Sequence, residues 1–300
     1  MNQLEALRRN QIMRIFAKLC HDLRIIGELA QMRITLYQCQ SWAADIERNL
    51  SRVAHAASRA AADGAGILLC PELMLTGYNV GRDPIGDLAE SVDGPAAQRI
   101  AAIAAANNIA IVYGYPERAG DAIYNAAQLI DRDGTARLNY RKTHLFGNAE
   151  RETFTAGKDL SQVTDIDGWM IGILVCYDVE FPEPVRLLAL AAAELVLVPT
   201  ALMQPYDALP SILIPARAYE NQLYVAYANY CGTAGNVNYC GSSLIAAPDG
   251  RCLAHAGRAE EMPSADISHD VLIASRRGNT YLADRRPALY GALVSKRPDP

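Results

Sequence analysis

The 300-residue chain lacks the features that mark several large classes of protein. It has no run of about 18 uncharged apolar residues, so we expect no transmembrane helix and no membrane partner. It has no long basic run, and its net charge is −5, which argues against a nucleic-acid partner. Its five histidines are scattered without a pair at ligand spacing, so we predict no metal site.

The seven cysteines do not have the pattern of a disulfide framework, because their number is odd and their spacing irregular. Thiols of this kind are typical of a reducing compartment, so we expect a cytoplasmic protein. Cys70 lies in an apolar run and is interpreted as a core residue. Cys231 and Cys240 flank a Gly/Asn loop and could meet, but a reduced pair is preferred.

The composition, 51% hydrophobic and 20% charged, suits a globular protein with one large core. No Gly/Ser/Pro tract divides the chain, so we expect one domain over residues 32–290 with a tail at 291–300. Residues 1–31 are interpreted as an N-terminal extension, either a loosely held helix or an artefact of start-site choice.

Short apolar runs alternate with alanine-rich amphipathic stretches along the domain. The predicted strands are residues 33–38, 67–70, 109–115, 170–175, 195–198, 223–228 and 271–274. The predicted helices are 42–63, 95–107, 184–193 and 209–222, and a polar loop is expected over 144–158. Two hairpins are expected, 122–130 with 135–142 and 239–246 with 252–256. This mixture predicts an α/β fold in which two sheets pack face to face between helices, a four-layer αββα sandwich.

Three polar side chains come at the ends of buried strands. Cys176 follows the apolar run 170–175 and precedes a helix, whose first amides would favour a thiolate. Taken alone, a cysteine in this place is usually a small core residue. Glu72 and Lys142 end two other strands, however, and the three together supply a nucleophile, a base and a cation for an oxyanion.

The segments around these residues are C-P-E-L, Y-R-K-T-H-L-F-G and C-Y-D-V-E-F-P-E. In order and separation they resemble the carbon–nitrogen hydrolase family, also called the nitrilase superfamily. The resemblance implies the αββα fold, no metal or organic cofactor, and a homodimer or larger homo-oligomer formed through the outer helices. It also implies a second acid eight residues beyond the lysine, which is Glu150; Glu152 competes but misses the spacing.

The resemblance further implies an amidase mechanism with a thioester intermediate. Cys176 would attack an amide carbonyl after Glu72 takes its proton, and Lys142 with the backbone N–H of Tyr177 would hold the oxyanion. The Y-D that follows the cysteine favours amides over nitriles. His144 could suggest a Cys–His pair, but it is interpreted as an anchor of its loop.

Glu180 is the most informative position for the substrate, because family members that act on carboxylate substrates commonly carry an arginine there. An acid would instead attract an ammonium group; the alternative is that Glu180 faces solvent or pairs with Arg186. Tyr78, Asn79 and Tyr115 are expected to line the pocket.

The resemblance is strongest to the branch that hydrolyses short amino-amides, such as 5-aminopentanamide to 5-aminopentanoate and ammonia in bacterial lysine breakdown. Three alternatives remain: an N-carbamoyl amine such as N-carbamoylputrescine, a stereoselective amino acid amide hydrolase, and a catalytically silent binding protein.

Overall fold

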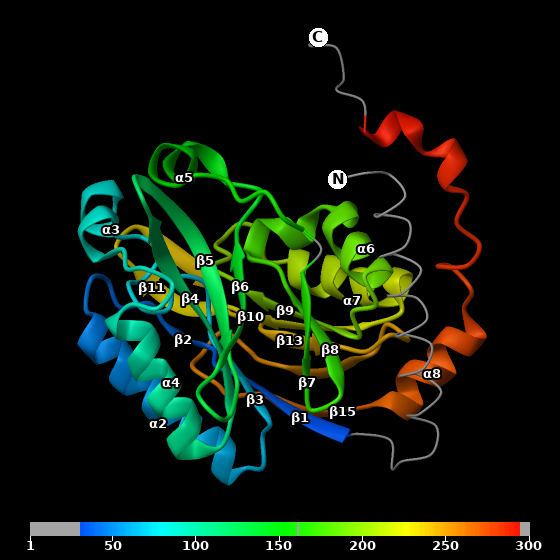
Figure 1. Ribbon diagram of the computed structural model, residues 1–300, viewed down its shortest axis with the longest axis horizontal. Coiled ribbons are helices and arrows are strands. Elements are labelled where there is room, and N and C mark those ends of the chain that lie inside the picture. Colours follow the sequence, from blue (N-terminus) through cyan, green and yellow to red (C-terminus); the bar gives the residue numbers. More distant parts are fainter. Residues whose placement is uncertain (1–30, 161, 295–300) are drawn as a thin grey trace.

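Residues 31–160 and 162–294 are described by a computed structural model, and they form two six-stranded sheets between helices. The predicted N-terminal extension therefore lies outside the described residues, apart from Gln31, the first residue of β1. Figure 1 shows α2 and α4 on one side of the strands and α6 and α7 on the other. The predicted four-layer αββα sandwich is confirmed.

The first sheet has the strand order β15-β1-β3-β4-β5-β6. Its strands are β1 (Gln31–Leu36), β3 (Ile67–Leu69), β4 (Ala110–Ala119), β5 (Ala122–Ile130), β6 (Ala136–Arg141) and β15 (Ser264–Ser268). The strands β1, β3 and β4 run parallel, and the predicted hairpin of β5 and β6 adds two antiparallel strands. The ends of β3 and β6 later supply two of the three predicted catalytic side chains.

The second sheet has the order β14-β13-β10-β9-β8-β7. Its strands are β7 (Val163–Ile166), β8 (Trp169–Ile173), β9 (Leu195–Pro199), β10 (Tyr224–Ala228), β13 (Leu244–Ala246) and β14 (Cys252–His255). A small third sheet joins β2 (Cys39–Gln40), β11 (Tyr230–Ala234) and β12 (Val237–Cys240).

Side-chain alternation along the strands separates the layers of the core. Ile67 and Leu69 on β3 belong to the core between the two sheets, whereas Leu68 packs toward the helices. The helices outside the first sheet are α2 (Ile46–Ala62) and α4 (Pro95–Asn107), and those outside the second are α6 (Pro182–Leu190) and α7 (Leu209–Asn221). Each sheet is thus buried on both faces, which is why its strands read as continuous apolar runs.

Three predictions of local structure were wrong. Residues 271–274 belong to α8 (His269–Gly278), which Ser268 caps and which buries Leu272 on one side. The expected loop 144–158 contains the short helix α5 (Gly147–Thr153). The stretch 239–246 is divided between two sheets, because β12 pairs with β11 while β13 pairs with β10 and β14. The sequence analysis also missed α3 (Arg82–Leu88) and the strands β2, β7, β11 and β15.

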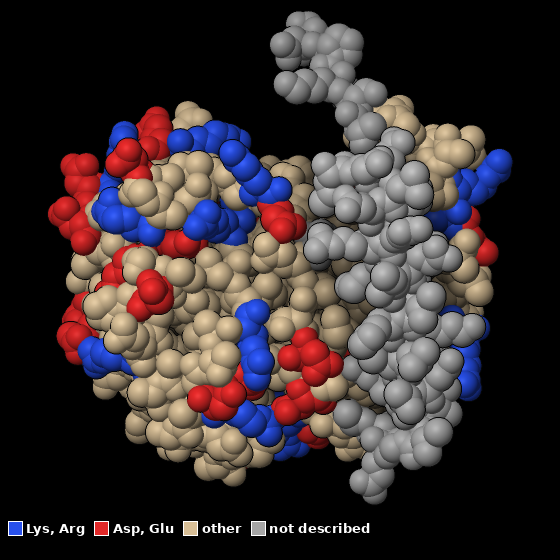
Figure 2. Space-filling model, viewed as in Figure 1, with Lys and Arg blue, Asp and Glu red and all other residues tan. Residues whose placement is uncertain are grey.

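Within residues 31–160 and 162–294, no helix is long and apolar enough to cross a membrane. Figure 2 shows positive and negative side chains interspersed over the face that it displays, with uncharged surface between them. On the described part of that face, the charges do not form a continuous basic stripe of the kind that binds nucleic acid.

Candidate active site

Cys176 begins a single 3-10 turn, η1 (Cys176–Glu180), just beyond the end of β8. Its φ is +46°, in the left-handed region that a residue with a Cβ rarely adopts, at a cost of about 1–3 kcal/mol. The strained turn is held by neighbouring backbone, since Asp178 N donates to Val175 O at 3.1 Å. The chain therefore turns sharply at the thiol instead of continuing the strand into the core.

The structure brings the other predicted catalytic side chains together beside this turn. Lys142 follows β6 and is fully buried, and its Nζ donates to Glu72 Oε1 at 2.8 Å and to Glu150 Oε1 at 2.7 Å. Glu72 follows β3 and is also fully buried. Glu150 is the buried residue of α5, whereas Glu152 is exposed, so the spacing rule selected the acid that contacts the lysine.

The close approach of Glu72 to the sheet depends on a glycine in β4. A Cβ added at Gly114 would lie 2.2 Å from Leu73 N and 2.8 Å from the Glu72 carbonyl carbon. No side chain can be accommodated at that distance, so glycine is required for the turn after β3 to pack against β4.

The two oxygens of Glu72 have different surroundings. Oε1 accepts from Lys142 Nζ and, at 2.6 Å, from Asn125 Nδ2 on β5. Oε2 is buried and has no hydrogen-bond partner among the described residues. Glu72 raises the pKa of Cys176, so the two groups lie near one another, and Oε2 is the oxygen of Glu72 that is free to accept a proton.

Burial governs the ionisation of the site. It raises the pKa of the Cys176 thiol well above its ordinary value; Glu72 raises it further, and Lys142 and a backbone hydrogen bond from Ala201 only partly offset this. Burial therefore favours a thiol as the resting group, where the sequence analysis expected a thiolate. A base is needed to deprotonate it.

The same burial acts in opposite directions on the other two groups. It raises the pKa of Glu72, which Lys142 lowers and Glu150 raises. For Lys142, burial alone would lower the pKa, but the carboxylates of Glu72 and Glu150 outweigh it and raise the pKa well above its ordinary value. The lysine therefore stays an ammonium, with two of its three N–H groups bound to carboxylates.

Asp178 connects the turn after Cys176 to the segment around Lys142. Its Oδ1 accepts from Thr143 Oγ1 and from His144 N and Nδ1, each at 2.8 Å. Its Oδ2 accepts from Tyr140 O–H at 2.9 Å and from Val175 N at 3.2 Å. The ring of His144 also stacks on Phe181, so the prediction that His144 anchors its loop is confirmed.

Glu180, the last residue of η1, is half-buried. Burial raises its pKa to about 7, and Lys142 and Arg217 only partly oppose this. Glu180 forms no ion pair with Arg186 in the described parts of the chain, and its side chain remains partly open to solvent. A partly desolvated carboxylate near the lysine is suited to receive a cation from a ligand.

The three residues expected to line the pocket have different positions. Tyr78 lies at the site, but its hydroxyl donates to Glu150 Oε1 at 2.7 Å, so it supports the acid instead of presenting a free hydroxyl. Asn79 is exposed and donates to Ala234 O and Asn236 Oδ1, across to the β11–β12 hairpin.

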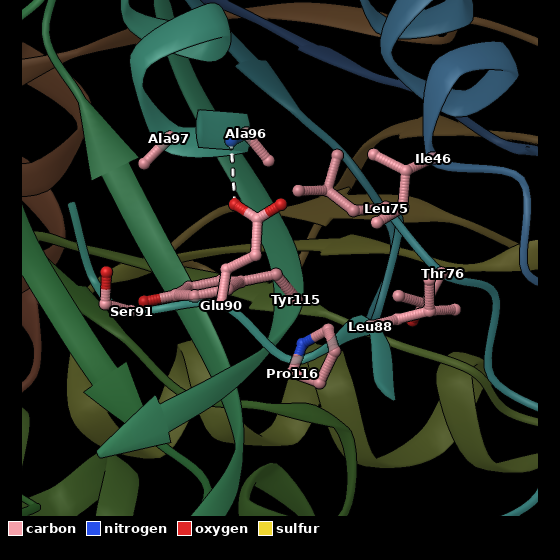
Figure 3. A pocket seen from close by; sticks show the side chains of 10 residues that line it. All are labelled: Ile46, Leu75, Thr76, Leu88, Glu90, Ser91, Ala96, Ala97, Tyr115 and Pro116. Atoms are coloured by element: carbon pink, nitrogen blue, oxygen red, sulfur yellow. Dashed lines mark hydrogen bonds between the residues drawn. The ribbon is translucent and has the colours of Figure 1, made fainter. Parts of the chain in front are cut away.

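The placement of Tyr115 in the pocket was wrong. Tyr115 alternates with Gly114 along β4, so its ring faces the helix layer, where its hydroxyl donates to Asn139 Oδ1 at 2.9 Å. There it lines a cavity of about 10 Å³, which Figure 3 shows beside Glu90 and Ala96 at the start of α4. Position near a strand end was a poor criterion because it ignored which face of the strand carries the ring.

The sequence analysis missed three polar residues of the site: Asn125, Asp178 and Tyr227. Asn125 and Tyr227 each interrupt an apolar strand, and Asp178 follows Cys176 by two residues, which are the signals that could have found them. Tyr227 on β10 is buried, and its pKa is raised first by burial and then by the nearby charges of Cys176 and Glu180. Among the described residues, no group of three or more His, Cys, Asp or Glu is arranged to hold a metal ion.

A buried cysteine, a carboxylate with one open oxygen and a lysine held between two acids form a constellation for acyl transfer. A family model of carbon–nitrogen hydrolases matches residues 33–277. The chain belongs to the carbon–nitrogen hydrolase family.

Known members support an amidase within this family. A Pseudomonas protegens protein described as a hydrolase in the pqqF 5′ region is 54% identical over 273 residues, covering 91% of this chain and 95% of its own. An (R)-stereoselective amidase of a Pseudomonas species is 36% identical over 261 residues, covering 87% of this chain and 93% of its own. These similarities make the chain a carbon–nitrogen hydrolase acting on amides.

A solved structure agrees with this assignment. The NitN amidase of Nesterenkonia sp. AN1 matches with a TM-score of 0.77 at 35% identity, covering 88% of this chain and 100% of its own. Other structures of that amidase show acrylamide added to its active-site cysteine and a complex with butyramide.

Proposed function

We propose that this carbon–nitrogen hydrolase releases ammonia from a short linear amino-amide, with 5-aminopentanamide as the substrate and 5-aminopentanoate as the acid product. The proposal that the substrate has an amine end rests on Glu180, a half-buried carboxylate whose pKa is raised to about 7 by burial. Lys142 and Arg217 act on this carboxylate only from a distance, with no ion pair to its side chain among the described residues, and an ammonium group on the substrate would supply one.

In the proposed mechanism, Glu72 Oε2 takes the proton from Cys176 Sγ as the sulfur attacks the amide carbonyl carbon. The carbonyl oxygen becomes an oxyanion, which the third N–H of Lys142 and the backbone N–H of Tyr177 stabilise. The C–N bond then breaks, and Glu72 returns the proton to the leaving ammonia. The product of this half-reaction is a thioester on Cys176.

The second half-reaction releases the acid. Glu72 takes a proton from water, whose oxygen attacks the thioester carbonyl, and the sulfur leaves as the proton returns to it. Glu150, held by Tyr78, keeps Lys142 oriented through both steps. The addition of acrylamide to the cysteine of the Nesterenkonia amidase, and the binding of butyramide to its cysteine-to-alanine variant, support a cysteine site for short amides.

The test is the rate of ammonia release from 5-aminopentanamide, pentanamide and N-carbamoylputrescine. We expect kcat/KM for 5-aminopentanamide to exceed that for pentanamide by at least about tenfold, the effect of one favourable charge pair. Preference for N-carbamoylputrescine would keep the mechanism and change the substrate. Absence of turnover with all three would contradict the proposal.

A stereoselective amino acid amide hydrolase is the second candidate, because the (R)-stereoselective amidase is similar over most of its length. An α-ammonium group would lie nearer the carbonyl than the terminal ammonium of 5-aminopentanamide does. Rates with the two enantiomers of an amino acid amide decide between them: a large enantiomeric preference at a rate above that of 5-aminopentanamide would favour this candidate. The proposed setting is the cytoplasm, where thiols stay reduced.

A further inference from the structure

Asn125 is a buried polar side chain for which the proposed mechanism has no role. It lies on β5 with no exposed surface, between the apolar side chains of that strand. Its Nδ2 donates to Glu72 Oε1 at 2.6 Å, and its backbone carbonyl accepts from Lys142 N at 2.8 Å. One residue therefore contacts both the base and the backbone of the lysine.

The hydrogen bonds around Glu72 divide its carboxylate into two unlike oxygens. Lys142 and Asn125 both donate to Oε1, whereas Oε2 has no partner among the described residues. A carboxylate held by the lysine alone could rotate and present either oxygen to it. Two donors from different strands fix the plane of the carboxylate, because each restricts the oxygen along a different direction.

We infer that Asn125 is a positioning residue that holds Glu72 with Oε2 directed to the thiol of Cys176, an inference that rests on the proposed role of Glu72 as the base. Asn125 does not contact the reacting carbonyl in this account. It acts through Glu72 by keeping the acceptor oxygen in place and by favouring its ionised form.

Because Asn125 favours the ionised form of Glu72, its removal should change the pH dependence of the reaction. Burial is the main cause that raises the pKa of Glu72, and the hydrogen bond from Asn125 is one of the interactions that lower it. The titratable groups that face Glu72 from the surrounding elements are Lys142, Glu150, Cys176, Tyr78, Tyr230 and Tyr239. Removing the amide leaves all of these in place, so Glu72 should take up its proton at higher pH than in the native protein.

The test compares Asn125→Ala with the native protein over the acidic limb of kcat/KM for amide hydrolysis. We expect kcat to fall by about 10- to 100-fold and the acidic limb to move up by about one pH unit, as for a lost hydrogen bond to a charged group. Gln128→Ala is the matched control, because Gln128 is a buried amide on the same strand that bonds Tyr113 and Val92 on the opposite face. Its acidic limb should stay at the native position.

A second measurement separates this inference from the substrate assignment. The measurement is the rate at which iodoacetamide alkylates Cys176, followed by peptide mass mapping over a range of pH. Alkylation depends on Glu72 accepting the thiol proton, but it needs no substrate. In Asn125→Ala, we expect the acidic limb of the alkylation rate to move to higher pH, as for kcat/KM, even if 5-aminopentanamide is not the substrate. An unshifted alkylation profile in a folded Asn125→Ala protein would overturn the positioning role.

The isosteric Asn125→Asp variant covers the case in which the alanine variant does not fold. It keeps the shape of the side chain but places a carboxyl group against Glu72, so the two acids share a proton and the acidic limb should move up further than in Asn125→Ala. An acidic limb at the native position in Asn125→Asp would overturn the inference. So would failure of both variants to fold, which would assign Asn125 to folding alone.

Discussion

At the scale of single residues, burial and neighbouring charges determine which groups of the site are ionised. Lys142 has no exposed surface, yet it keeps its charge because two carboxylates contact its Nζ. Cys176 keeps its proton for the opposite reason: its environment offers no sufficient compensation for a buried thiolate. In the proposed mechanism, deprotonation of the thiol therefore depends on the open oxygen of Glu72.

Glu180→Gln tests the proposed recognition of an amine. The substitution removes the carboxylate charge but keeps its size, so we expect KM for 5-aminopentanamide to rise by about tenfold while KM for pentanamide stays nearly unchanged. Steady-state kinetics with both amides measure this. Equal increases in the two KM values would refute an electrostatic role for Glu180.

The pH dependence of the native protein tests the same residue without mutation. Because burial raises the pKa of Glu180 to about 7, the side chain is neutral below that pH and charged above it. The ratio of kcat/KM for 5-aminopentanamide to that for pentanamide should therefore fall as the pH decreases through 7. A ratio that is constant from about pH 6 to 8 would contradict this, since effects on the shared catalytic groups cancel in the ratio.

At the scale of elements, the site consists of strand ends and the short turns that follow them. The turn η1 follows β8, and Asp178 within it accepts hydrogen bonds from Thr143 and His144. These two residues directly follow Lys142, which comes just after β6. The nucleophile and the lysine thus come from different sheets but are connected through one buried carboxylate.

Asp178→Asn should destabilise the protein strongly. An amide NH2 would replace one acceptor oxygen and face donors instead, so we expect the free energy of unfolding to fall by about 3 kcal/mol. Urea denaturation measures it. Asp133→Asn is the control, because Asp133 is an exposed turn carboxylate whose loss should cost less than about 1 kcal/mol. Similar small losses in both variants would show that the hydrogen-bond network around Asp178 contributes little.

Much of the fold was predictable because buried strands and amphipathic helices leave clear periodic patterns. The hairpin of β5 and β6 and the helices α4 and α7 were predicted nearly to the residue. The segment α8 was misread as a strand, because the Val-Leu-Ile at its start is apolar and partly β-branched. The deciding features were the Ser268 cap and the burial of only His269 and Leu272. Short edge strands such as β7 and β15 carry too few residues to show a period.

The site was predictable as far as its motifs extended. Glu72, Lys142, Glu150 and Cys176 were identified because their spacing follows a family pattern, and the structure brings their side chains together. The sequence could not reveal that Asn125 contacts Glu72, because that contact depends on the pairing of β5 with β4 and β6. It also could not show that Tyr115 faces away, which depends on strand register.

At the scale of the whole molecule, apolar side chains are exposed on the outer helices of the second sheet. Leu187 and Leu190 on α6 and Ile212 and Tyr219 on α7 are 40–62% exposed. Further exposed apolar residues follow in the C-terminal segment: Tyr281, Leu289, Tyr290 and Leu293. A concentration of this kind on one side is typical of a protein interface.

We propose that this face contacts a second copy of the chain. Light scattering coupled to size exclusion should give at least twice the 32.6 kDa mass of one chain. Leu190→Glu combined with Ile212→Glu should shift the protein toward the monomer, because each places a charge in an apolar contact. A native protein that is monomeric at micromolar concentration would contradict the proposal.

The central claim is that Cys176 is the nucleophile of an amidase. The most direct measurement is ammonia release from 5-aminopentanamide by Cys176→Ala, with circular dichroism to confirm the native fold. The account predicts a loss of at least about a thousandfold in kcat with folding intact, because no other group in the site can form the acyl-enzyme. A folded Cys176→Ala protein that retains a substantial fraction of native activity would contradict it.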